Sequence, residues 1–322
     1  MTWAPDPAAF LADLEAKPEA LRALASAIDG DPWPVDASRV RRVVLFGMGS
    51  SRSAALVAAS RLRARGIDAW AEYASAEAVH PGGPGTLAVA ISASGNTEET
   101  VAAFRRHAEA GSTTVALTNV AGSPLTGVGE AHLEMLAGPE AGGVACRSFQ
   151  HTVLRLLQLE GHLGEAGPDV RRLALAAADA SEDLLSRRDA WLPGATEMAT
   201  GADGTFLIAP NERISSAEQG ALMLREGPRR RADACESGDW LHVDVYLTKS
   251  LDYRAIVFAG SRFDEVIMTW MGERGARVLA VGADVAGAAA HVRFPGDGGP
   301  DVALVSEILV PELVAAALWR RA

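Results

Sequence analysis

Length, composition and charge already restrict what this protein does. With 322 residues, of which 48% are hydrophobic, the chain can form one large or two ordinary domains, which excludes disordered and fibrous proteins. Its formal net charge of -11 argues against nucleic acid and anionic membranes as partners, because the basic run Arg229–Arg231 is too short to offset it.

The cysteines and the N-terminus indicate a compartment. Cys146 and Cys235 have no paired spacing that suggests zinc or a redox centre, and so few cysteines favour a reducing environment. The N-terminus lacks the basic and apolar regions of a secretory signal, and we expect no segment apolar enough to span a bilayer. The cytoplasm is therefore the expected location.

Strands and helices alternate through the first half of the chain. Apolar spacing predicts two short helices within residues 7–29, and a run of branched apolar residues predicts a buried strand at 41–47. Further strands are expected at 67–73, 86–91, 113–118 and 134–136, with helices at 54–66, 98–110 and 143–163. This alternation is typical of a parallel sheet covered on both faces.

The second half repeats this plan. After a helix at 170–188, we expect strands at 205–209, 255–259 and 278–281, and helices at 216–226, 262–274 and 311–321. Residues 94–118 align with 260–282 as a degenerate repeat, but only the first copy keeps its hydroxyl residues. The predicted fold class is α/β, with two tandem flavodoxin-like parallel sheets flanked by helices. The expected domains are N-terminal helices 1–40, a first domain 41–165, a connecting helix 166–200 and a second domain 201–322.

Two serine-rich turns are the main candidates for a binding site. GMGSSRS at 47–53 and SASGNT at 92–97 each follow a predicted strand, so neighbouring parallel strands would bring them to one crevice. Hydroxyls beside unpaired helix N–H groups favour an anion, although Ser and Thr also serve simply as helix caps. A dinucleotide site is a weaker alternative, because Arg52 replaces the last glycine of GxGxxG even though Glu72 lies near the position of a ribose-binding acid.

Two residues in the second half are candidates for proton transfer. Glu226 ends a predicted helix before Gly-Pro, where partial desolvation would raise its pKa toward the range of a general base. From the residue alone, an exposed glutamate paired with an arginine is favoured. His242 is equally a candidate acid and a structural histidine. The other histidines show no metal-ligand spacing, so we expect no metal.

Together these motifs resemble the sugar isomerase (SIS) domain family, in particular the isomerase domain of glucosamine-6-phosphate synthase and its stand-alone phosphosugar isomerase and deaminase relatives. The resemblance covers residues from about 43 to 313. GSS at 49–51 and SASGNT at 92–97 are similar to the family's phosphate turns, and TNV at 118–120 and AGPEAGGVACRSF at 137–149 to two further family segments. EQGALMLREG through GDWLH is similar to the family's EGALKLKE and GE-x-KHGP region.

The resemblance implies roles for individual residues. The sugar 6-phosphate would be bound by Ser51, Ser92, Ser94 and Thr97, and the substrate would be lined by Gly49, Ser50, Gly95, Asn96 and Val144. Glu226 would move a proton between C1 and C2, which reverses the preference stated above. His242 would open the sugar ring, acting from the partner subunit of a homodimer.

The departures from the family pattern narrow the chemistry. Met223 replaces a lysine of the helix motif, and Ala93 replaces a polar residue of the phosphate turn. The family's C-terminal tail with its Schiff-base lysine, and a glutamine amidotransferase domain, have no counterpart in residues 1–322, and Lys249 matches no motif position. We therefore expect no covalent imine, no amidotransferase activity and no cofactor.

The expected function is conversion of a hexose or amino-sugar 6-phosphate, of the glucosamine or N-acetylglucosamine 6-phosphate type. An aldose-ketose isomerase or deaminase would act by abstracting the C2 proton. One alternative is a lyase that eliminates the C3 substituent of an N-acetylhexosamine 6-phosphate, as a dehydratase or etherase. Another is a non-catalytic sugar-phosphate sensor, which is less favoured because residues 1–40 are too short and acidic for a DNA-binding domain.

Overall fold

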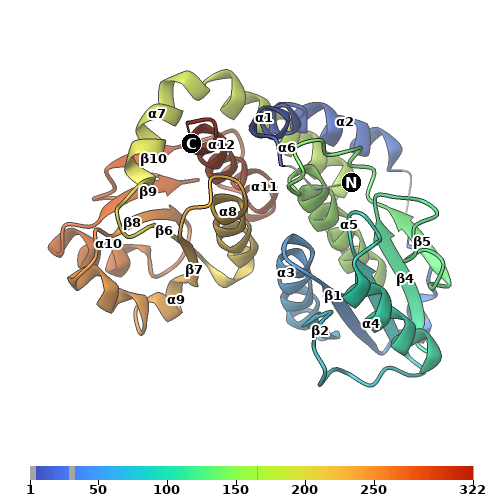
Figure 1. Ribbon diagram of the computed structural model, residues 1–322. Coiled ribbons are helices and arrows are strands. Elements are labelled where there is room, and N and C mark those ends of the chain that lie inside the picture. The colour runs from blue at the N-terminus through green and yellow to red at the C-terminus, as the bar shows by residue number, and fades with distance from the viewer. Residues whose placement is uncertain (1–4, 29–32, 165, 322) are drawn as a thin grey trace. The chain divides into compact units, whose positions relative to one another are not determined.

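The computed structural model describes residues 5–28, 33–164 and 166–321, and the chain divides into two compact units (Figure 1). The N-terminal unit comprises Ala20–Glu140 and Arg147–Ala174, and the C-terminal unit comprises Met1–Glu19, Ala141–Cys146 and Leu175–Ala322. Each unit contains one five-stranded parallel sheet, which confirms the predicted fold class. The predicted domain limits stay predictions. The limits at residues 165 and 322 fall outside the described residues, and so does residue 29, the predicted end of the N-terminal helical region.

The N-terminal unit follows the predicted elements closely. Its sheet has the order β2-β1-β3-β4-β5, formed by β1 (Arg42–Gly47), β2 (Asp68–Tyr73), β3 (Thr86–Ile91), β4 (Thr113–Thr118) and β5 (Ala131–Glu134). Its helices are α3 (Ser50–Ala64), α4 (Glu98–Glu109) and α5 (Arg147–Leu163), with the short η1 (Ala37–Arg39) before β1. α3 begins four residues before the predicted start, because Gly49 adopts a φ of 50° and lets the chain turn directly into the helix.

The C-terminal unit repeats the strand order of the N-terminal unit. In both sheets the second strand of the unit lies at one edge, followed by the first, third, fourth and fifth. Its sheet is β10-β9-β8-β6-β7, formed by β6 (Thr205–Ala209), β7 (Ala232–Glu236), β8 (Arg254–Phe258), β9 (Arg277–Val281) and β10 (Ala290–Val292). The helices are α1 (Pro7–Glu15), α7 (Arg188–Ala199), α8 (Ile214–Glu226), α9 (Ser237–Trp240), α10 (Asp264–Glu273), α11 (Pro300–Ser306) and α12 (Leu309–Trp319), with η2 (Asn211–Arg213) and η3 (Asp244–Lys249). α2 (Lys17–Ala27) and α6 (Val170–Ser186) contain residues of both units.

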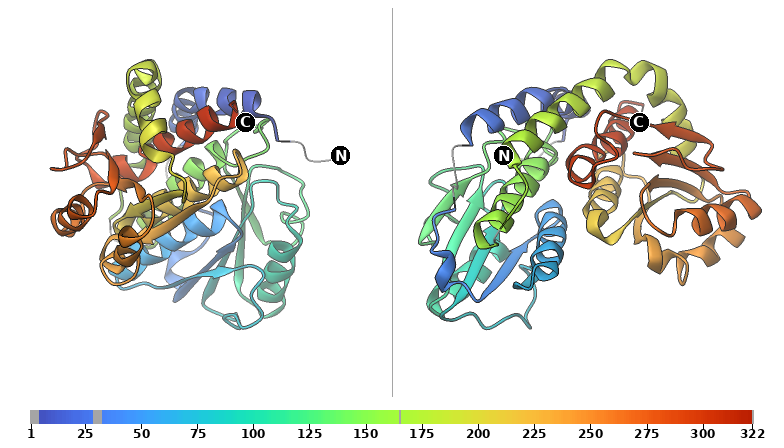
Figure 2. Two further views of the ribbon diagram at one scale, coloured as in Figure 1. Left: turned by 60° about the vertical axis from the view of Figure 1, so that its left-hand side comes forward. Right: turned by 180° about the vertical axis from the view of Figure 1, so that it is seen from behind.

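Alternate residues of β6 separate two apolar cores in the C-terminal unit. Leu207 and Ala209 pack in the core that includes α8 and α12, whereas Phe206 and Ile208 pack with Trp240 on the other face. This is the period of two expected for a strand buried on both faces. Figure 2 shows the helices on both faces of each sheet.

The C-terminal segment Pro300–Trp319 corrects one expectation. By length and composition its 20 residues could cross a membrane, whereas the sequence analysis expected no segment apolar enough to do so. In the structure 83% of its most apolar window is buried, with Leu309 and Leu313 in the core of the C-terminal unit. Glu312 on the same segment pairs with Lys17, and both side chains are fully buried. Packing within the unit therefore accounts for the apolar composition.

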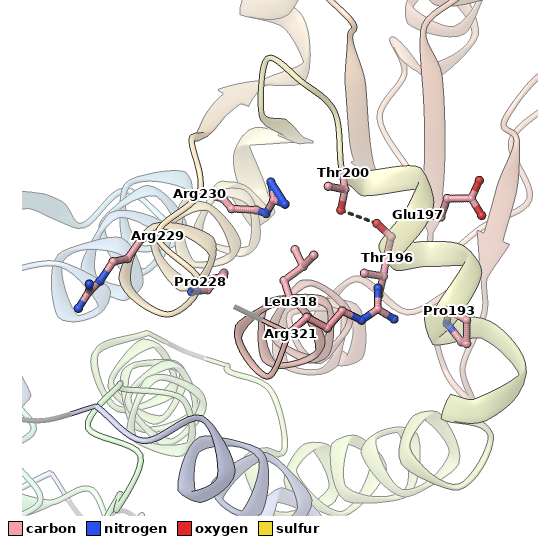
Figure 3. A pocket seen from close by; sticks show the side chains of 9 residues that line it. All are labelled: Pro193, Thr196, Glu197, Thr200, Pro228, Arg229, Arg230, Leu318 and Arg321. Atoms are coloured by element: carbon pink, nitrogen blue, oxygen red, sulfur yellow. Dashed lines mark hydrogen bonds between the residues drawn. The ribbon is translucent and has the colours of Figure 1, made fainter.

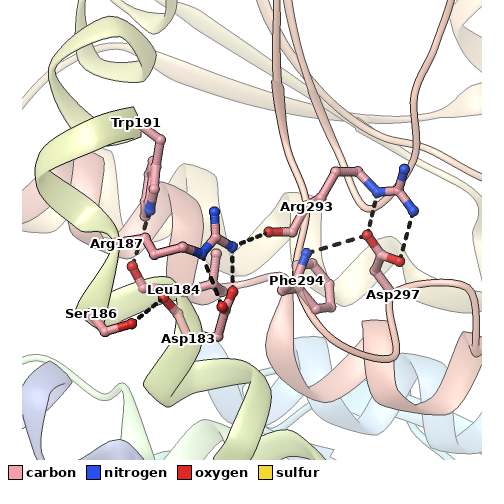
Figure 4. A network of polar contacts seen from close by, with 8 residues as sticks. All are labelled: Asp183, Leu184, Ser186, Arg187, Trp191, Arg293, Phe294 and Asp297. Carbon is pink, nitrogen blue, oxygen red and sulfur yellow. Dashed lines mark hydrogen bonds and ion pairs between the residues drawn. The ribbon is translucent and has the colours of Figure 1, made fainter.

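A polar network joins α6 to the segment after β10 (Figure 4). Arg187 donates to Asp183 over 2.9 Å and to the carbonyl oxygen of Arg293 over 2.8 Å. Arg293 in turn pairs with Asp297. Because these side chains are partly exposed, each pair contributes only about 0–1 kcal/mol, and the network mainly fixes local geometry.

His107 on α4 is a buried histidine in the N-terminal unit. Its side chain is almost fully buried, and its ring stacks on Phe46 with the centroids 5.3 Å apart and lies parallel to the ring of His80. Burial, followed by the nearby charges of His80 and Arg106, lowers the pKa of His107 to about 4. The unfolded chain therefore binds this proton at a higher pH than the folded protein does.

We predict that the N-terminal unit loses stability as the pH falls from about 6.5 toward 4. Between pH 7 and 4.5, His107 should lower the free energy of unfolding by about 2 kcal/mol, since each pKa unit is worth about 1.4 kcal/mol. His107→Phe removes the titration and should flatten this part of the profile. Urea unfolding across this pH range measures both slopes, and equal slopes would contradict the assignment.

Candidate functional site

The carboxyl ends of β1 and β3 form the point where the strand order of the first sheet reverses. β1 pairs with β3 on one side and with β2 on the other. A Cβ atom on Gly47 would lie 2.7 Å from the Cβ of Ser51 and 2.8 Å from the carbonyl oxygen of Ile91. Only glycine permits this approach, so the turns after β1 and β3 lie side by side. In open α/β sheets this is the place where ligands bind.

The turn from Ser92 to Thr97 is held by its own polar groups. The Ser92 and Thr97 hydroxyl oxygens lie 3.1 Å apart, and the Gly95 N–H donates to Ser92 Oγ over 3.1 Å. The Asn96 N–H donates to Ser94 Oγ over 3.2 Å. Gly95 has a φ of 65°, and a Cβ there would meet the Ser123 hydroxyl at 2.1 Å. The turn therefore requires glycine at this position.

Two helices begin directly after these turns, and the Ser51 N–H in the first turn of α3 donates to the carbonyl oxygen of Met48 over 3.1 Å. α3 has 15 residues and α4 has 12, and within the described residues no side chain caps either helix at Gly49 or Thr97. Their positive ends and orphan N–H groups favour an anion. The structure thus brings together, at one edge of the sheet, the predicted binding residues Gly49, Ser50, Ser51, Ser92, Ser94, Gly95, Asn96 and Thr97.

The corresponding edge of the second sheet is different chemically. A cavity of 1200 Å³ lies at the carboxyl ends of β6, β8 and β9, and His242 lines it. In the turn after β8, the N–H groups of Gly260 and Ser261 donate to the Asp264 carboxylate over 2.7 and 3.1 Å. A carboxylate of the chain itself therefore takes the position that an anion would occupy. This gives a physical reason for the expectation that only the first half binds one.

Glu226 is the last residue of α8, followed by Gly227 at the C-cap. Its side chain reaches solvent, yet surrounding protein atoms partly remove the carboxylate from water. This desolvation raises the pKa of Glu226, and the positive charge of Arg225 offsets part of the increase. Glu226 forms no ion pair with another described residue, although its side chain is exposed and the charge of Arg225 acts on it. Its role as a base therefore stays a prediction.

His242 and Glu226 lie at opposite ends of α8. His242 lines the cavity beside the start of this helix, and Glu226 is its last residue. His242 follows β7 and α9, and its backbone N–H donates to the carbonyl oxygen of Asp239 over 2.9 Å. α8 has 13 residues, starts beside the cavity that His242 lines and ends at Glu226, so its length is roughly 18 Å. Within one C-terminal unit the two side chains therefore do not meet. A contribution of His242 from a partner subunit stays a prediction.

Val144 occupies a packing position. Its side chain is only 2% exposed, in the core of the C-terminal unit with Phe10 and Leu14. The next residue accepts a hydrogen bond through its carbonyl oxygen from Gln219 Nε2, over 2.8 Å. The segment is thereby fixed to the C-terminal unit, and the expectation that Val144 lines the substrate stays a prediction.

The cysteines and acidic clusters offer no additional chemistry. Cys146 is buried, and Cys235 is half-buried. Burial, with the nearby charges of Asp244 and Asp239, raises the pKa of the Cys235 thiol to about 12, so it is not a nucleophile at neutral pH. Within residues 5–28, 33–164 and 166–321, no group of three or more His, Cys, Asp or Glu side chains is placed to hold a metal ion.

Comparison with known proteins identifies the family. Residues 38–159 match the family described as SIS domain, so the resemblance inferred from the motifs is confirmed and this part of the chain is a SIS domain. The glutamine–fructose-6-phosphate aminotransferase (isomerizing) of Halobacterium salinarum is 31% identical over 221 residues, which cover 64% of this chain and 36% of that protein. The Aeropyrum pernix protein of the same name is 29% identical over 304 residues, which cover 87% of this chain and 49% of that protein. The chain thus spans between about a third and a half of the length of these relatives.

Solved structures agree in fold. The C-terminal domain of glucosamine-fructose-6-phosphate aminotransferase from Francisella tularensis has a TM-score of 0.80 at 16% identity, covering 97% of this chain and 96% of that one. Tagatose-6-phosphate ketose/aldose isomerase from Escherichia coli has a TM-score of 0.76 at 16% identity, covering 100% and 96%. Glucosamine-6-phosphate deaminase from Thermotoga maritima has a TM-score of 0.71 at 17% identity, covering 97% and 94%. At these identities the likeness concerns the fold alone.

The raised pKa of Glu226 predicts where activity is lost in acid. The general base that the family resemblance implies at Glu226 would work only when deprotonated, so the acid limb of the kcat profile is expected above the ordinary glutamate pKa of 4.5. Arg225→Gln removes the charge that lowers this pKa and should move the limb to still higher pH. Measured kcat profiles of both proteins test this, and a limb that moves to lower pH in the variant would contradict it.

Proposed function

We propose that this protein is an enzyme that converts a hexose or amino-sugar 6-phosphate by removing the proton at C2. The observation that carries the proposal is the pair of uncapped helix N-termini, lined with hydroxyls, at the β1/β3 edge of the SIS domain. The raised pKa of Glu226 supports a base in the same chain. Relatives and neighbours named as isomerases and deaminases of sugar phosphates support the substrate class.

In the proposed mechanism the phosphate is the anchor. Ser51, Ser94 and Thr97, with the free N–H groups of α3 and α4, bind it at a distance from the reacting carbons. Binding energy from this remote group fixes the sugar for reaction. His242 protonates the ring oxygen and opens the hemiacetal, and Glu226 then removes the C2 proton, which the C1 aldehyde has made acidic.

The resulting enediol or enolamine has two fates. Protonation at C1 gives the ketose or, when C2 carries an unsubstituted amine, a C2 imine that water hydrolyses to ammonia and the ketose 6-phosphate. Isomerisation or deamination is therefore the first proposal. Expulsion of the C3 substituent instead makes the enzyme a lyase. This alternative stays open because residues 1–322 have no lysine at a motif position that could shuttle the nitrogen.

We also propose a cytoplasmic homodimer. Val243 and Tyr246, directly after His242, are 55% and 61% exposed, and Trp270 on the neighbouring α10 is 39% exposed. Arg274 joins the two elements by covering the Trp270 ring and donating to the Thr248 hydroxyl over 2.9 Å. An apolar surface around the proposed acid is suited to a second copy, which would receive His242 in its own site.

Proton exchange at C2 tests the enzyme proposal directly. The full chain is incubated in deuterated water with the 6-phosphates of glucosamine, N-acetylglucosamine, fructose and glucose, and C1, C2 and C3 are followed by NMR. We expect deuterium at C2 of at least one substrate. A new vinyl signal at C3 selects the lyase, and binding without any exchange supports the sensor and refutes the enzyme.

Matched variants assign the base. Glu226→Gln should lower the exchange rate by roughly 100-fold or more, as expected for loss of a general base. Glu273→Gln, an exposed glutamate on α10, removes the same charge in the same unit and should leave the rate unchanged. If the two variants behave alike, Glu226 is not the base.

A further inference from the structure

A second pocket in the C-terminal unit takes no part in the proposed reaction. It has a volume of 830 Å³ and lies where the C-terminal ends of α7, α8 and α12 meet (Figure 3). This volume falls within the range of roughly 300–1,000 Å³ that is usual for small-molecule sites. Its lining includes Arg229 and Arg230, two residues of the basic run Arg229–Arg231, for which the sequence predicts no role.

Two arginines from different elements face the same space. Figure 3 shows Arg230, in the turn after α8, and Arg321, after α12, on two sides of the pocket, with Thr196 of α7 and its C-cap residue Thr200 along a further side. In the same view Glu197 points away from the arginines. Neither the Arg230 nor the Arg321 guanidinium forms an ion pair with another residue that the structure describes.

The electrostatic balance of the pocket is positive but small. Three arginines and one glutamate line it, and three helix ends each contribute about half a negative charge. One interpretation is that the arginines only neutralise these ends. Two guanidinium groups that converge on one cavity also provide the forked donors that suit a phosphate.

The rest of the lining consists of acceptors and apolar groups. The Thr196 hydroxyl donates to the Leu192 carbonyl oxygen over 2.7 Å, and the Thr200 hydroxyl donates to that of Thr196 over 2.6 Å. Each hydroxyl oxygen therefore has lone pairs left to accept, as have the last carbonyls of the helices. A ligand here needs its own hydroxyl donors, and Leu318 and Pro228 supply apolar contact.

We infer that this pocket binds a polyhydroxylated phosphate ester, with its phosphate on Arg230 and Arg321 and its hydroxyls donating to the threonine and helix-end oxygens. A sugar phosphate and a nucleotide share this chemistry. The turn that carries Arg230 begins directly after Glu226, so an occupied pocket restrains the end of α8. Regulation through this pocket rests on the proposed role of Glu226, whereas ligand binding there uses other residues and is tested independently of the proposed reaction.

Calorimetric titration of the full chain tests this inference. A Ser94→Ala/Thr97→Val background disables the proposed phosphate turn, and the probes are glucosamine 6-phosphate, AMP, inorganic phosphate, glucosamine and adenosine. We expect at least one phosphate ester to bind more tightly than inorganic phosphate and its unphosphorylated counterpart. Which ester binds distinguishes the sugar from the nucleotide. Equal binding of the ester and inorganic phosphate, or no binding, overturns the inference.

Arginine variants locate the binding. Arg230→Gln/Arg321→Gln in the same background should weaken ester binding by roughly tenfold or more, as expected for loss of charge-assisted hydrogen bonds. Arg320→Gln should change it less than twofold, because Arg320 lines only the neighbouring pocket on the other side of Thr196 and Arg321 and does not line this one. If the double variant unfolds, ester binding is measured with the single variants Arg230→Gln and Arg321→Gln, and each should weaken it. If the variants lower only the melting temperature and leave binding intact, the arginines are helix-end neutralisers and the inference is wrong.

Discussion

The proposed chemistry of this protein depends on the N–H groups at the starts of α3 and α4, to which the described residues offer no side-chain cap. Gly47 and Gly95 make this arrangement possible, since any side chain at either position would meet neighbouring atoms at under 3 Å. An anion bound there supplies the hydrogen bonds that a capping side chain otherwise provides. A sugar phosphate then binds through the group that takes no part in the reaction, which leaves its carbons free for a base.

The two sheets share one strand order but differ in chemistry. At the second edge, Asp264 accepts from the backbone N–H groups of Gly260 and Ser261, while Arg213 pairs with the buried Glu307. The charges at this edge are therefore largely satisfied within the chain. In the proposed function the first sheet binds the anion, and the second provides Glu226 and His242 from opposite ends of its elements.

The parts of the fold that could be predicted are those whose reasons are local. After one polar residue each, β1 and β3 are apolar runs buried on both faces, and both were predicted to within one residue. The edge strands β7 and β10 are short and partly exposed, so no apolar run marks them. The position of both serine-rich turns followed from their place after strands. The raised pKa of Glu226 and the core position of Val144 depend on contacts made by distant parts of the chain, which no single segment encodes.

The most direct measurement of the central claim is a crystal structure with a hexosamine 6-phosphate bound. The account predicts that the phosphate accepts hydrogen bonds from the Ser51, Ser94 or Thr97 hydroxyl and from the N–H groups at the start of α3 or α4. A phosphate found only at Arg230 and Arg321, with the turns after β1 and β3 unoccupied at saturating ligand, would contradict it.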